Sequence, residues 1–187
     1  MTVTDHQRLR YNDSNGGVVC LLGKSFCNNP IRACHFVQLY EADEAALTHN
    51  VGQYLWEGIR QGDGVLVIAM PEHQELFRGH LVSLGADLAV LLKNHQLVFA
   101  DAELTLSEIM AGGQPDWRNF ERVIRGAMRR VRPAIGKQGL RAYGEMVGML
   151  WKVRQFAAAI RLEQLWNKLF GTIRIQPVLR IRNRRFR

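Results

Sequence analysis

The stretch GDGVLVIAMPEH, Gly62–His73, decides the fold class of this chain. Its central part, Val65–Met70, is an unbroken apolar run. A strand that is apolar at every position is covered on both faces, which is typical of parallel sheets. Gly62-Asp63-Gly64 predicts a turn before the strand, and Pro71 suits the first turn of a helix after it. The stretch therefore predicts a buried parallel strand that leads into a helix.

The same alternation of strand and helix continues on both sides of this stretch. Further strands are expected at 35–40, 97–100 and 140–145. Helices are expected at 43–61, from Pro71 to about Gly85, at 104–110, at 117–131 and, as one long helix, from 146 to about 170, with a short helix or turn at 87–93. Alternating strands and helices predict an α/β fold with a mostly parallel sheet and helices on both faces.

The net charge of +8 belongs to the ends of the chain. Residues 174–187 contain six arginines and no acid, whereas residues 35–173 contain 15 basic and 15 acidic residues. We interpret residues 1–33 as a loosely ordered arm, in which Val18–Gly23 is either a short strand or a stray apolar patch. The basic end is expected to be a solvated tail, so nucleic acid is not the expected partner.

Neither a membrane location nor an oxidising compartment is expected. No apolar run approaches the roughly 20 residues that span a bilayer, and the first 15 residues lack the apolar core of a signal peptide. Cys20, Cys27 and Cys34 are spaced too widely for a typical metal site, and free thiols are the better interpretation. We therefore predict a cytoplasmic protein, with a redox or metal role for these cysteines as the minor alternative.

Acidic residues stand at or just after four predicted strands. They are Glu41, Glu72, Asp101 and Glu145. Ligands of open α/β sheets bind outside the carboxyl ends of the strands, so these acids are candidates for a ligand site at one sheet edge. Tyr40 precedes Glu41, and Trp151 follows Glu145 closely enough to wall an apolar pocket beside it. For each acid, helix capping is the competing interpretation.

The motifs of common enzymes are missing. The sequence has no phosphate loop of the form G-x4-G-K-[ST] and no G-x-G-x-x-G between a strand and a helix. It has no G-x-S-x-G serine and no H-E-x-x-H pair, and Glu72-His73 is interpreted as ordinary surface. We therefore expect no catalytic residue, no metal and no cofactor.

Five arginines form a stripe along the predicted helix at 117–131. Arg118, Arg122, Arg125, Arg129 and Arg132 step by four, three, four and three residues. The stripe could meet nucleic acid or an acidic partner. A solvated helix face is the favoured interpretation because no aromatic residue interleaves with the arginines.

Several separated motifs together resemble a known family. They are HFVQLYEADEAAL (35–47), GDGVLVIAMPEH (62–73), LVFADAEL (97–104), GQPDWRNF (113–120), YGEMVGMLW (143–151) and AAAIRLEQLWNKL (157–169). They resemble the MEDS domain, the sensory domain named for methanogens, methylotrophs and the dichloromethane-responsive repressor. The resemblance covers about residues 34–170, which we predict to be the folded domain, and residues 171–187 are then an Arg-rich tail.

The resemblance implies a prokaryotic signalling domain that senses a small organic molecule. It also implies a degenerate RecA-like, three-layer fold from which the phosphate loop has been lost. The expected partners are a small organic ligand and a histidine kinase or transcriptional regulator, and a homodimer is a further expectation. The predicted ligand site comprises Tyr40, Glu41, Glu72, Asp101, Glu145 and Trp151. The alternatives are a RecA-like protein that acts only through protein contacts and a residual nucleotide-binding ATPase.

Overall fold

The computed structural model describes residues 19–21, 37–39, 44–135 and 139–172. Most of the predicted arm at 1–33 and nearly all of the predicted tail at 171–187 lie outside these residues. Within the described part of the chain, no helix is long and apolar enough to cross a membrane.

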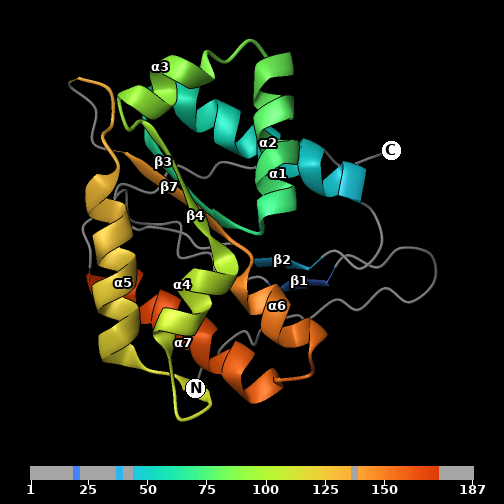
Figure 1. Ribbon diagram of the computed structural model, residues 1–187, viewed down its shortest axis with the longest axis vertical. Helices are drawn as coiled ribbons and strands as arrows, with labels where there is room; N and C mark the ends of the chain where they lie inside the picture. Colours follow the sequence, from blue (N-terminus) through green and yellow to red (C-terminus); the bar gives the residue numbers. More distant parts are fainter. Residues whose placement is uncertain (1–18, 22–36, 40–43, 136–138, 173–187) are drawn as a thin grey trace, which may run out of the picture.

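A three-stranded parallel sheet forms the centre of the described structure (Figure 1). Its middle strand is β3 (Gly64–Ala69), which pairs in parallel with β4 (Leu97–Asp101) on one side and β7 (Leu140–Gly144) on the other. Every residue of β3 is buried, as its unbroken apolar run predicts. The carboxyl ends of the three strands therefore lie at one edge of the sheet.

Helices pack on both faces of this sheet, and the alternation of β3 side chains divides the core in two. Val65, Val67 and Ala69 pack with α1 (Glu44–Gln61), α2 (Pro71–Ser83) and α3 (Leu88–Lys93). Leu66 and Ile68 pack with α4 (Ala102–Ile109), α5 (Trp117–Arg130), α6 (Met146–Lys152) and α7 (Phe156–Thr172). The predicted α/β class, with a parallel sheet and helices on both faces, is confirmed.

Aspartates begin three of the helices. The side chains of Asp87, Asp101 and Asp116 accept hydrogen bonds from backbone N–H groups at the starts of α3, α4 and α5. Such caps satisfy donors that the helix itself leaves unpaired. They explain why each of these helices begins where it does.

The expected strand at 35–40 does not join the parallel sheet in the described residues. Its described part, β2 (Val37–Leu39), pairs antiparallel with β1 (Val19–Leu21) in a separate two-stranded sheet. An apolar, aromatic composition identified the strand but could not identify its partner, because pairing depends on residues distant in sequence. The apolar patch at Val18–Gly23 is therefore a strand over its central three residues.

The prediction of one long helix from 146 to about 170 is wrong. The helical conformation is interrupted between Lys152 and Phe156, so two helices form, α6 and α7. Arg154 has a φ of 60°, the left-handed region, and ends α6. The break lets Leu150 of α6 and Leu162 of α7 bury against the same core. Val153, which continued the apolar spacing in the sequence, is 64% exposed at the corner.

A small hairpin connects α4 to α5. Met110–Ala111 (β5) and Gln114–Pro115 (β6) pair antiparallel, and Gly112 and Gly113 connect them with φ values of 57° and 79°. Two consecutive positive φ angles are characteristic of the tight turns that match strand twist.

A buried ion pair holds the opposite, amino-terminal edge of the sheet. The Nε of Arg141 donates to Asp63 Oδ2 at 3.0 Å, and the arginine also donates to the Tyr54 carbonyl and to Gln61 Oε1. Its side chain is only 4% exposed. This cluster fixes the end of α1 to the amino-terminal ends of β3 and β7.

Candidate functional site

Glu145 occupies the junction between β7 and α6, at the carboxyl edge of the sheet. Its backbone N–H donates to the Ile68 carbonyl at 3.0 Å, which holds the residue beside β3. Its side chain makes no capping bond to α6. Instead, Oε2 accepts the backbone N–H of Met70 at 2.9 Å. The carboxylate therefore links β7 to the point where β3 turns into α2, and helix capping does not explain it.

His73 of α2 is the main side-chain partner of Glu145. Its Nδ1 lies 2.6 Å from Glu145 Oε1, and the two side chains are 22% and 10% exposed. An ionised carboxylate only accepts hydrogen bonds, so Nδ1 carries the proton in this contact. In the neutral ring, Nε2 is then a hydrogen-bond acceptor. Glu145 thus fixes both the orientation and the tautomer of the imidazole.

The free end of the imidazole points toward α1. His73 Nε2 lies 3.8 Å from Oε1 of Glu44, the first residue of α1, whose side chain is 67% exposed. This distance is too long for a hydrogen bond, so among the described residues Nε2 has no hydrogen-bond partner and can bind another group. A neutral imidazole there accepts from a donor, and a protonated one donates to an acceptor.

Aromatic side chains support this pair from below. The Tyr143 hydroxyl donates to Glu145 Oε1 at 3.2 Å, and its ring meets Phe77 edge-to-face with centroids 5.4 Å apart. Phe77 is fully buried and lies 6.2 Å from the His73 ring. One side of the His73 ring therefore faces the buried ring of Phe77, while the side chain remains 22% exposed to solvent.

Gln74 fixes the start of α2 to two strands at once. Its Nε2 donates to the carbonyls of Ala69 and Ala100, at 2.8 and 3.0 Å. These are residues near the ends of β3 and β4. Because Gln74 follows His73 directly, these two hydrogen bonds also restrain the position of His73 relative to the sheet.

The six predicted site residues have different environments. Asp101 follows Ala100 at the end of β4, but its carboxylate caps α4 through the Leu104 N–H at 2.9 Å, which supports the capping interpretation for this residue. It lies two strand spacings from Glu145, or roughly 10 Å. Glu72 is exposed in the first turn of α2. Tyr40 and Glu41 lie outside the described residues.

Trp151 packs at the corner between α6 and α7. Its ring meets Phe156 edge-to-face, with centroids 4.7 Å apart. Six residues of helix separate it from Glu145, about 9 Å along the axis. No contact in the described structure joins the two residues, so the wall that we predicted beside Glu145 stays a prediction.

His73 is the functional candidate that the sequence did not identify. The interpretation of Glu72-His73 as ordinary surface holds for Glu72 only, because the helix turns the adjacent histidine toward β7. One signal was available: Pro71 fixes the start of α2, which places His73 one turn from the strand end. Its contact with Glu145 spans 72 residues of sequence and could not be read from spacing.

The arrangement suits recognition of a polar group more than binding of a metal. In the described residues, no group of three or more His, Cys, Asp or Glu side chains is placed to hold a metal ion. Both oxygens of Glu145 are occupied by protein donors. The chemistry that remains available is a hydrogen bond at His73 Nε2, with the carboxylate of Glu44 nearby.

Comparison with known proteins adds a family to this geometry. A family model described as the methanogen/methylotroph, DcmR sensory domain (MEDS) matches residues 34–176, which is most of the 187-residue chain. Searches of curated proteins and of solved structures gave no significant match. The matched range includes β2 and every later described element, and hence all residues of the Glu145–His73 site. The chain belongs to the MEDS family of sensory domains.

Proposed function

We propose that this MEDS domain senses a small organic molecule whose polar group binds His73 at the carboxyl edge of the sheet. The observation that carries the proposal is the short contact between His73 Nδ1 and Glu145 Oε1, 2.6 Å. Two residues that are far apart in the sequence are held in one geometry, and among the described residues the second ring nitrogen of His73 has no hydrogen-bond partner. A few fixed polar groups beside apolar side chains are typical of small-ligand sites.

In this proposal the two residues have different roles. His73 is the contact residue, and Glu145 is a positioning residue because its oxygens already accept three protein donors. Glu44 is a second contact, since its carboxylate stands 3.8 Å from His73 Nε2 and is exposed. The preferred ligand therefore carries a hydroxyl or amine that donates to Nε2, to Glu44 or to both.

The signal would be carried by α1 and α2. A group bound between His73 and Glu44 connects the first turns of these two helices, which pack on the same core. Ligand binding would then stabilise one relative placement of α1 and bias contact with a kinase, a regulator or a second copy. The proposal includes a RecA-like ancestry without a phosphate loop, as the family resemblance implies.

A ligand screen with matched variants tests the proposal. Small alcohols, amines and other polar organic molecules are screened by thermal shift, and each hit is measured by calorimetry against wild type, His73→Phe, Glu145→Gln and Glu72→Gln. His73→Phe keeps a ring of similar size and removes both nitrogens. We expect at least tenfold weaker binding with His73→Phe, about 1.4 kcal/mol, a smaller loss with Glu145→Gln, and no change with the exposed control Glu72→Gln. Hits whose affinity is unchanged by His73→Phe would refute the site.

Retained nucleotide hydrolysis is tested in the same experiment. The sequence lacks a phosphate loop, so we expect ATP and GTP to give no thermal shift. Saturable nucleotide binding that Glu145→Gln abolishes would replace the sensory interpretation of this edge.

A further inference from the structure

Helix α5 presents a line of arginines to the solvent. Four of them, Arg118, Arg122, Arg125 and Arg129, lie within an arc of about 60° on the face opposite the buried side chains of the helix. Arg132 follows just after the end of the helix, beyond the extended residue Val131. All but Arg125 are exposed. Phe120, Ile124 and Ala127 form the buried side. We call these five residues the arginine stripe.

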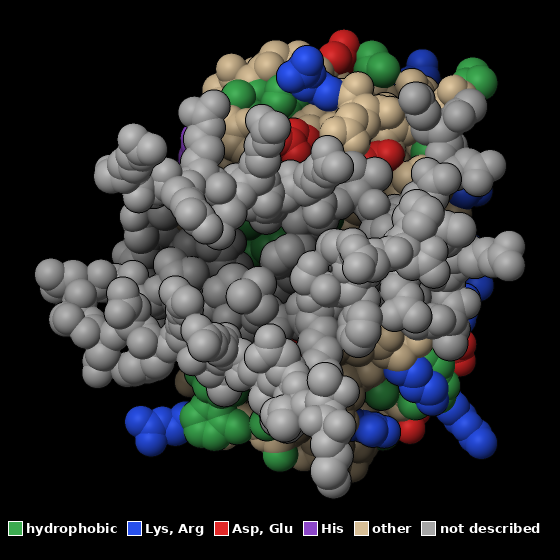
Figure 2. All heavy atoms as spheres, turned by 180° about the vertical axis from the view of Figure 1, so that it is seen from behind, with side chains coloured by type: hydrophobic (Ala, Val, Ile, Leu, Met, Phe, Trp, Pro, Cys, Tyr) green, Lys and Arg blue, Asp and Glu red, His purple; other side chains and the backbone are tan. Residues whose placement is uncertain are grey.

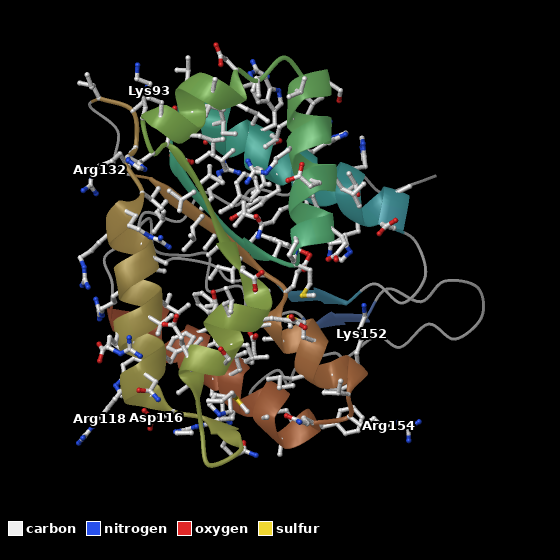
Figure 3. The ribbon with its side chains drawn as sticks, in the orientation of Figure 1. Lys93, Asp116, Arg118, Arg132, Lys152 and Arg154 are labelled. Atoms are coloured by element: carbon white, nitrogen blue, oxygen red, sulfur yellow. The ribbon has the colours of Figure 1, made fainter. Side chains whose placement is uncertain are left out.

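Figure 3 shows the two ends of the arginine stripe. Arg118 and Arg132 extend away from the body of the protein at opposite ends of α5, and Lys93 lies beyond Arg132. The backbone N–H of Arg132 donates to the His95 carbonyl at 2.7 Å. This hydrogen bond holds this end of the stripe beside the turn that follows α3. Seen from behind, Lys and Arg side chains lie along the edge that α5 forms (Figure 2). From Arg118 to Arg129 the helix rises roughly 16 Å, and Arg132 extends the stripe beyond the end of α5.

Few carboxylates balance the stripe within the described residues. Glu121 pairs with Arg125 at 3.0 Å, and Glu108 of α4 reaches Arg122 only at 4.0 Å, with both side chains more than half exposed. Exposed pairs of this kind are weak. Neighbouring arginines three or four residues apart on one helix repel each other. Among the described residues, the stripe therefore has more arginines than carboxylate partners.

The helix dipole accounts for only one half of the stripe. Cations are favourable in the last turn of a helix, where Arg129 lies, but unfavourable in the first turn. Arg118 is the second residue of α5, directly after the capped start at Asp116. Arg118 thus stands where positive charge opposes helix stability, so the helix dipole does not explain its position.

The form of the stripe favours an acidic helix over nucleic acid. Of the 15 basic and 15 acidic residues in 35–173, Lys137, Glu41 and Asp43 fall outside the described residues, which leaves 14 and 13. A domain so near neutrality lacks the net basic field of nucleic-acid-binding domains, and the stripe has no aromatic side chain for base stacking. By contrast, glutamates at every third or fourth position of a helix have the same 5–6 Å spacing as these arginines.

We propose that α5 is the docking face for an acidic helical segment of a partner protein. Arginine suits this role because its planar guanidinium pairs carboxylates through two parallel hydrogen bonds. The surface lies on the opposite side of the sheet from α1 and α2, so it is separate from the His73 site. Partner docking at α5 therefore does not require the ligand proposal to be correct.

A designed peptide tests this surface in the full chain. The probe is a fluorescein-labelled, 21-residue alanine-based helical peptide with glutamates at alternating three- and four-residue steps. The matched probe has glutamine at the same positions. The protein variants are Arg122→Glu/Arg129→Glu on the stripe and Lys152→Glu/Arg154→Glu, which reverses as many exposed charges at the α6–α7 corner. Binding is followed by fluorescence anisotropy at several salt concentrations.

We expect the glutamate peptide to bind wild type and the corner variant alike, and the stripe variant at least tenfold more weakly. The glutamine peptide should not bind, and affinity for the glutamate peptide should fall as salt increases. Equal binding to the stripe variant would overturn the proposal, because the basic residues outside α5 would then be responsible. A 20-base-pair DNA duplex that binds more tightly than the peptide, and loses that binding in the stripe variant, would overturn the assignment to an acidic protein.

Discussion

Replacing Glu145 with alanine tests whether its carboxylate holds the end of β7 to the start of α2. The substitution removes the acceptor for Met70 N–H, the ion pair with His73 and the hydrogen bond from Tyr143. The side chain is only 10% exposed, so the substitution also removes the packing of its methylene groups. The three polar contacts set the lower end of the expected change in stability.

The expected loss of stability is about 3 kcal/mol. An unpaired backbone N–H costs about 1–3 kcal/mol, and we take about 1.5 for Met70. The pair with His73, which is partly exposed, is discounted to about 1 kcal/mol. The Tyr143 hydroxyl can turn to water, so its 3.2 Å bond contributes about 0.5 kcal/mol. Glu145→Gln keeps an acceptor for Met70 and should lose only about 1 kcal/mol.

Urea unfolding followed by circular dichroism and tryptophan fluorescence measures this loss. With a slope of about 2 kcal/mol per molar urea, the midpoint should fall by about 1.5 M for Glu145→Ala and about 0.5 M for Glu145→Gln. Glu72→Ala, at the exposed residue directly before His73 in α2, should stay within about 0.5 kcal/mol of wild type. A Glu145→Ala midpoint indistinguishable from that of Glu72→Ala would refute the bridging role.

Three further predictions concern the scaffold. Arg141→Ala leaves Asp63 buried without its partner and should cost about 3–5 kcal/mol of unfolding free energy, or roughly 6–20 °C in melting temperature; a loss below 1 kcal/mol would contradict the buried network. Asp116→Ala removes the cap of α5 and should cost about 1 kcal/mol, measured by urea unfolding with Asp116→Asn as the variant that restores most of it. Arg154→Gly should stabilise the chain by about 0.5–1 kcal/mol because glycine adopts the positive φ without strain, whereas Lys152→Gly within α6 should destabilise it.

The central part of the fold could be predicted from local patterns. The unbroken apolar run at 65–70 predicted a buried strand, and Pro71 and Asp116 marked the starts of α2 and α5. Features that depend on distant residues were missed. The interruption between α6 and α7 at Arg154 lets both helices bury side chains in one core. No glycine or proline at this point of the sequence predicts it.

The position of Glu145 at the sheet edge could be predicted from the sequence, but its side-chain partners could not. Glu145 was identified because a lone acid followed a predicted strand, and the structure puts it at the sheet edge. His73 was missed because its importance comes from β7 lying beside β3, a pairing that sequence spacing does not specify. Asp101 looks the same as Glu145 in sequence, yet one carboxylate caps its own helix and the other reaches across to the next strand.

The most direct test of the central claim is the nitrogen spectrum of the His73 imidazole during titration with a ligand found in the screen. Protein labelled with ¹⁵N-histidine, assigned with His73→Phe, reports the tautomer and the hydrogen bonding of each ring nitrogen separately. We predict that free protein has the proton on Nδ1, and that ligand binding shifts the Nε2 resonance while leaving the Nδ1–Glu145 contact in place. Saturating ligand with both His73 nitrogen resonances unchanged would contradict the account.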